Sequence, residues 1–129
     1  MAAPFIFIGT HAIKEGKLEE FKETALELVR LVREMEPRMI AFNFYLNEDE
    51  TEATIVQVHP DADSMLHHMQ VARQHIMKGT EDLLVTKGIQ IYGLQNDVVL
   101  DMIAELSQSD VPLDVKPHHI DGVTRSSAG

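Results

Sequence analysis

Histidine is the side chain most suited to acid–base chemistry near neutral pH, and three of the seven histidines lie between residues 61 and 78. At about 100° per residue in a helix, this stretch forms one apolar stripe of Met65, Met69, Ala72 and Ile76. His68 and His75 are seven residues apart and lie on one flank of the stripe, whereas His67 points nearly opposite, towards solvent. An imidazole at the edge of an apolar stripe either faces a ligand pocket or closes the boundary of a core.

His68 is the candidate catalytic residue. In a pocket it would act as a general base or hydrogen-bond to an oxyanion. The alternative is a helix-edge histidine that bonds to a backbone group. His75, a little under two turns later, would support it. We expect His68→Ala to reduce turnover steeply and to affect the fold little.

Three strand residues are candidates for substrate binding together with His75. Asn43 and Tyr45 alternate on a predicted strand at 38–46, and Tyr92 lies on another at 88–94. If their strand faces point towards the helices, they would line a cavity and orient a phenolic or enolic substrate. The alternative is that Asn43 pairs locally and Tyr45 lies at the rim of a barrel.

A metal site is disfavoured by the spacing of the histidines. His67 and His68 diverge by about 100° on a helix, and no Asp or Glu lies three or four residues after His68. His11 or His59 from strands would add a ligand, but the spacing does not require one. The chain has no Cys and no nucleotide-binding glycine pattern, so we expect neither metal nor flavin nor any other cofactor.

The predicted elements follow the order β-α-β-β-α-β, which is the ferredoxin-like arrangement of an α+β protein. The strands are expected at 5–13, 38–46, 53–59 and 88–94, and the helices at 17–35 and 61–78. Residues 80–85 would add one or two helical turns. Such a sheet is antiparallel, with both helices on one face.

The opposite sheet face requires a cover of its own. Phe5 and Phe7 share one face of the first strand, and Ile6 and Ile8 share the other, so both faces are apolar. A partner's sheet is the economical cover, which predicts a homodimer. Residues 1–95 would form this domain. Residues 96–129 would form a helix and a loop-like tail that pack on the dimer.

Bulk composition narrows the class of protein. The chain has 129 residues and a formal net charge of -10, which argues against nucleic acid and anionic membranes as partners. The start of the sequence lacks the features of a signal peptide. No apolar run approaches the roughly 18 residues of a membrane span. We therefore expect a cytoplasmic protein with a small-molecule ligand.

Three short motifs resemble those of antibiotic-biosynthesis-monooxygenase (ABM)-like domains, which belong to the dimeric α+β barrel superfamily. The motifs are Gly16-x-x-x-Glu20-Phe21, Glu36-Pro37 and His59-x-Asp61-x-Asp63-x-x-x-x-His68. The resemblance covers about residues 5 to 95. It implies two ferredoxin-like sheets joined into a barrel, and a ligand cavity between sheet and helices in each monomer.

The resemblance also implies a range of activities. Some members oxygenate polyketide or quinol-type aromatics without metal or flavin, others degrade haem or isomerise metabolites, and many have no known activity. Arg38 and His59 depart from the pattern, and the lack of Trp disfavours haem degradation. We expect a cofactor-independent monooxygenase that acts on a small aromatic or quinol-type metabolite. The alternative is a non-catalytic ligand-binding or structural dimeric barrel protein.

Overall fold

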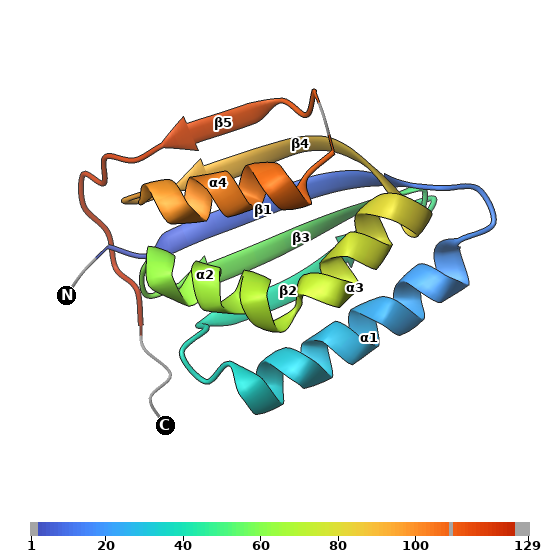
Figure 1. The fold of residues 1–129 in the computed structure, drawn as a ribbon, viewed down its shortest axis with the longest axis horizontal. Coiled ribbons are helices and arrows are strands. Elements are labelled where there is room, and N and C mark those ends of the chain that lie inside the picture. Colours follow the sequence, from blue (N-terminus) through green and yellow to red (C-terminus); the bar gives the residue numbers. More distant parts are fainter. Residues whose placement is uncertain (1–2, 109, 126–129) are drawn as a thin grey trace.

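Five strands form one mixed sheet, and all the helices lie on one of its faces (Figure 1). The structure is a computed structural model that describes residues 3–108 and 110–125. The sheet order is β2-β3-β1-β4-β5, in which only β4 and β5 run parallel. The strands are β1 (Phe5–Ile13), β2 (Ala41–Leu46), β3 (Glu52–His59), β4 (Leu84–Tyr92) and β5 (Leu113–Lys116). The predicted ferredoxin-like α+β fold is confirmed, with one further edge strand.

The helix boundaries follow local capping chemistry. The helices are α1 (Leu18–Met35), α2 (Ala62–Val71), α3 (Arg73–Lys78) and α4 (Asp97–Leu106), with a π-helical turn, η1 (Gly79–Leu83). α1 ends before Pro37, as predicted, since proline disfavours helical geometry in the residue before it. The Asp61 carboxylate begins α2 by accepting the Ser64 N–H at 2.9 Å.

Three local expectations are wrong. The helix expected at 61–78 breaks at Ala72, which has φ -96° and ψ 8°, and continues as α3. The helical turns expected at 80–85 end at Leu83, because the chain passes through the wider π-helical turn η1, and β4 then begins at Leu84, before the strand start expected at 88. The tail is not wholly loop-like, because residues 113–116 pair with β4 as β5.

The inner sheet face carries the core. Phe5 and Phe7 face the helices, as alternation along a strand requires. One apolar cluster joins β1 and β4 to α2 and α4, and a smaller one lies around Phe21 of α1. Val99, Ile103 and Leu106 of α4 are buried in the larger cluster, so this helix belongs to the core.

A β-bulge lies between β1 and β4. Thr10 pairs with Gly88, whereas His11 pairs with Thr86, so Lys87 is the extra residue of β4. The Gln108 side chain holds the bulged segment: its carbonyl accepts the Thr86 N–H, and its amide donates to the Leu84 carbonyl, each at 2.9 Å. The bulge therefore places His11 opposite Thr86.

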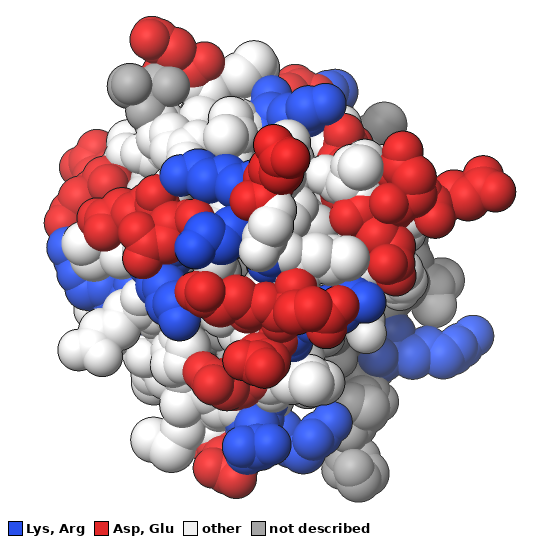
Figure 2. Space-filling model, turned by 90° about the vertical axis from the view of Figure 1, so that its right-hand side faces the viewer, with Lys and Arg blue, Asp and Glu red and all other residues white. Residues whose placement is uncertain are grey.

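The outer sheet face carries half-buried apolar side chains, whereas the surface drawn in Figure 2 is rich in charged ones. Ile6, Ile8, Val56 and Val58 are half-buried neighbours on the outer face. On the side of the molecule drawn in Figure 2, acidic and basic side chains intermix and the acidic ones cover more area. Within the described residues, no helix has both the length and the apolar character needed to cross a membrane.

Candidate functional site

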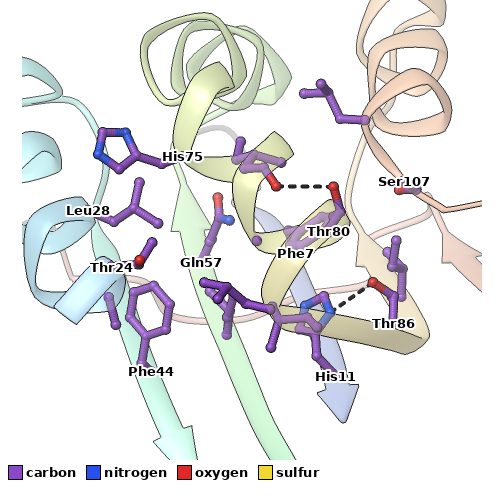
Figure 3. Close-up of a pocket in the computed structure, with 18 of the residues that line it drawn as sticks. Phe7, His11, Thr24, Leu28, Phe44, Gln57, His75, Thr80, Thr86 and Ser107 are labelled. Atoms are coloured by element: carbon purple, nitrogen blue, oxygen red, sulfur yellow. Dashed lines mark hydrogen bonds between the residues drawn. The ribbon is translucent and has the colours of Figure 1, made fainter. Parts of the chain in front are cut away.

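A cavity of about 100 Å³ lies between the inner sheet face and the helix layer (Figure 3). Its wall is mainly apolar and is built from α1, α2, α3, η1, α4 and the sheet. The polar side chains on the wall are His11, Thr24, Gln57, His75, Thr80, Thr86 and Ser107. An apolar cavity with a few polar groups is the usual form of a small-molecule site.

His11 projects from β1 into this cavity (Figure 3). Its Nδ1 lies 2.9 Å from Thr86 Oγ1. Burial lowers the pKa of His11 to about 4, so the imidazole is neutral at neutral pH. The ring leans over Gly9, where an added Cβ would lie 2.9 Å from His11 Nε2. Among residues 3–108 and 110–125, the His11 ring makes a hydrogen bond through Nδ1 and none through Nε2.

Gln57 projects from β3 into the same cavity, and His59 holds it. His59 Nε2 lies 2.9 Å from Gln57 Oε1, and His59 Nδ1 lies 2.7 Å from Ser64 Oγ. An amide oxygen can only accept, so Nε2–H donates to Gln57 and Nδ1 accepts the Ser64 hydroxyl. Burial, and secondarily the nearby His68, lower the pKa of His59 to about 3. His59 is therefore neutral and has both ring nitrogens occupied.

His68 lies outside the cavity wall. It is 1% exposed, and its Nδ1 lies 3.0 Å from both carboxylate oxygens of Glu36, which is also buried at the end of α1. The rings of Phe42 and His59 have centroids 5.2 and 6.1 Å from that of His68. These contacts place His68 in a packed polar cluster beside the cavity.

The structure brings only one predicted site residue to the cavity. His75 lines its rim, with Nε2 3.5 Å from a Glu27 carboxylate oxygen. Asn43, Tyr45 and Tyr92 lie on the outer sheet face, because their strand positions alternate with inward-facing Phe44 and Ile91. The condition under which these three would line the cavity is therefore not met.

Sequence reasoning missed two residues that do reach the cavity. His11 lies on the same strand face as Phe5 and Phe7 but was considered only as a metal ligand. The sequence did contain a sign of this, because His11 is a polar residue that follows apolar residues on the inward-facing side of the same strand. Gln57 shows the same pattern, because it lies on the same face of β3 as Ala53 and Ile55.

No protein-family model matches the sequence, and no curated protein matches it. Solved structures do match the fold. The chain is similar to MupZ from Pseudomonas fluorescens, with a TM-score of 0.71 and 18% identity over 98% of each chain. It is also similar to a protein from Nitrosomonas europaea named "Putative antibiotic biosynthesis monooxygenase", with a TM-score of 0.61, 18% identity, and coverage of 75% of this chain and 95% of that one.

A protein of the same name from Bacteroides thetaiotaomicron has a TM-score of 0.58 and 16% identity, over 65% of this chain and 83% of that one. The chain has the ABM-like fold. At these identities the likeness shows the fold alone. The match to MupZ spans nearly the whole chain and so includes α4 and β5. The ABM-like fold of this chain thus carries a C-terminal extension that completes the cavity wall with Ile103, Leu106 and Ser107.

Proposed function

We propose that this chain is a cofactor-independent monooxygenase that binds a small, mostly apolar phenol or quinol-type aromatic in the cavity. The observation that carries the proposal is His11, a buried neutral imidazole that lines a mainly apolar cavity and bonds through Nδ1 to Thr86. A positioned imidazole can take the phenolic proton, and general-base help is worth about 10²–10⁴ in rate.

The chemistry balances with molecular oxygen as the only co-reactant. His11 accepts the phenolic proton, and the ring carbon para to the oxygen gives its electron pair to oxygen and forms a C–O bond. The imidazolium returns the proton to the resulting peroxide. The O–O bond of the peroxide then breaks. The outer peroxide oxygen, which carries the returned proton, leaves as water together with the proton of the ring C–H group. For 1-naphthol the products are 1,4-naphthoquinone and water.

The low pKa of His11 sets a condition on this mechanism. Burial penalises the imidazolium, so the neutral form is fully available at neutral pH but is a weak base. A phenolate formed beside the imidazolium is an opposite charge within a few ångströms, which favours the charged ring. Proton transfer is therefore coupled to ligand binding. Thr86, through its hydroxyl contact, orients the ring.

A non-catalytic ligand-binding role is the second candidate. The mainly apolar wall favours it, because such a wall can hold an apolar ligand without any reaction taking place. Oxygen uptake separates the two roles. Wild type, His11→Ala and His68→Ala would be compared with 1-naphthol and related quinols. The monooxygenase role requires uptake with quinone formation that His11→Ala abolishes, and binding without uptake supports the second role.

His68 as the base stays a prediction, and the same experiment tests it. The contact with Glu36 and the position outside the cavity wall favour His11 instead. If His68→Ala removes turnover from a folded protein while His11→Ala retains it, the assignment is reversed.

We also propose that two copies pair through their outer sheet faces. The half-buried Ile6, Ile8, Val56 and Val58 support this pairing. In the single chain the tail residues Ile120 and Val123 are 99% and 80% exposed, which supports a tail that packs on the dimer. A stable folded monomer in light scattering at micromolar concentration would exclude the pairing.

A further inference from the structure

Gln57 shows an arrangement that a purely structural glutamine does not need. Its carbonyl oxygen is occupied by His59 Nε2–H at 2.9 Å, whereas its amide nitrogen has no hydrogen-bond partner among the residues that the structure describes. The side chain lines the cavity and points into the space that Phe7 and His11 also face (Figure 3). Its two N–H groups are therefore presented to whatever occupies that space.

The hydrogen bond from His59 orients the side-chain amide of Gln57. Because the atom of Gln57 that faces His59 Nε2 is the amide oxygen, which only accepts, the single proton of the neutral ring lies on Nε2, and Nδ1 accepts the Ser64 hydroxyl. The amide oxygen is the acceptor that Gln57 offers, so the N–H groups are turned away from His59. Ser64 is itself fixed, since its backbone N–H bonds to Asp61 at the start of α2.

The position of Gln57 relative to His11 defines a second anchor. The His11 ring lies over Gly9, which pairs with Ile55, and Gln57 is two residues further along β3 on the same face. His11 itself pairs with Ala53 and Gln57 pairs with Phe7, so their backbone positions are separated by four residues along the strands, roughly 13 Å at about 3.3 Å per residue. The Gly9–Ile55 pair lies between the two polar groups, and the His11 ring leans towards Gln57 over Gly9.

We propose that Gln57 is a ligand-binding residue that donates N–H hydrogen bonds to a carbonyl or phenolate oxygen at the edge of the ligand opposite to the oxygen that His11 contacts. The ligand class is a compact aromatic or partly reduced ring system with oxygens on opposite edges. His59 is a positioning residue in this site. The inference rests on the proposed function, because it concerns the same cavity and names its ligand class.

The test is a binding comparison of two probes that differ by one carbonyl, 1-tetralol and 4-hydroxy-1-tetralone, followed by ¹H–¹⁵N NMR. We expect wild type to bind the hydroxyketone roughly fivefold more tightly, as one net hydrogen bond would give. The side-chain NH₂ signals of Gln57 should shift with the hydroxyketone and not with 1-tetralol. This measurement needs no variant.

Variants then assign the preference to one side chain. Gln57→Met and Gln57→Leu should lose the preference and keep 1-tetralol binding, and His59→Phe should weaken the preference because the amide is no longer held. Gln90→Met is the matched control, since Gln90 is exposed on the outer face of β4. Melting temperatures identify any variant that does not fold.

The outcomes separate the two proposals. If neither probe shifts cavity signals, the proposed function fails together with this inference. If wild type binds both probes equally, or if folded Gln57→Met keeps the preference, the cavity remains a ligand site and the assignment of Gln57 is overturned.

Discussion

His11 and His68 are both almost fully buried, yet their surroundings differ in one decisive respect. His11 contacts a neutral hydroxyl through Nδ1 and lines the cavity. His68 bonds to the carboxylate of Glu36 and is enclosed by the rings of Phe42 and His59. Burial therefore does not distinguish a reactive histidine from a structural one. Contact with the cavity and the partner of Nδ1 do, because His11 lines the cavity and bonds to a hydroxyl, whereas His68 lies outside the cavity wall and bonds to a carboxylate.

Substitution of His11 and substitution of His68 should therefore have different effects. Removing His11 takes away a group that faces empty space, whereas removing His68 leaves the buried Glu36 carboxylate without its partner. The first change should affect activity, and the second should affect stability. The following predictions test this contrast, beginning with the largest effect.

His11→Ala should lower turnover of a phenolic substrate by about 10²–10⁴, because the general base is lost. Quinone formation from 1-naphthol, measured by absorbance, is the assay. His118→Ala, in the exposed tail, is the matched control. If His11→Ala turns over 1-naphthol as fast as wild type, His11 is not the general base.

Glu36→Ala and His68→Ala should each lower the free energy of unfolding by about 3–5 kcal/mol, since each leaves an unpaired buried polar group. This replaces the expectation that His68→Ala affects the fold little. Urea unfolding of both single variants and of the double variant measures the pair. We expect the double variant to lose less than the sum of the two single losses. Additive losses would show that the two side chains do not act as a pair.

Stability should decrease as the pH falls from about 6.5 towards 4. The pKa of His11 is lowered to about 4 in the fold from 6.5, so in this window the unfolded chain binds more protons than the folded chain. This difference corresponds to roughly 3 kcal/mol. His11→Phe should remove that part of the pH dependence, and denaturant melts at pH 7 and pH 4 measure it. Burial also lowers the pKa of His59, to about 3, so His59 should contribute to the pH dependence that remains.

Gly9→Ala should produce the smallest effect. The added methyl group would approach His11 Nε2 to 2.9 Å, so the ring must move. We expect a loss of about 1–3 kcal/mol from overpacking and a fall in turnover that is smaller than that of His11→Ala. Gly122→Ala in the exposed tail is the control. An unchanged His11 ring signal in NMR would show that the site tolerates the methyl group.

Local sequence patterns predicted most of the fold. Alternation placed Phe5 and Phe7 on one face of β1, and Pro37 marked the end of α1. The candidate site was predicted less well. The prediction that Asn43 and Tyr45 line the cavity required their strand face to meet the helices, but they alternate with the apolar Phe42 and Phe44, which take the inner face.

By itself, the sequence determined the order of elements, the alternating strand faces and the helix stripe, because these depend on neighbours within a few residues. Only the tertiary structure decided the partners of the histidines. Glu36 and His68 are 32 residues apart and meet through the packing of α1 against α2, and His11 meets Thr86 because a bulge shifts the register between β1 and β4. Such contacts depend on how whole elements pack and pair, which no local periodicity specifies.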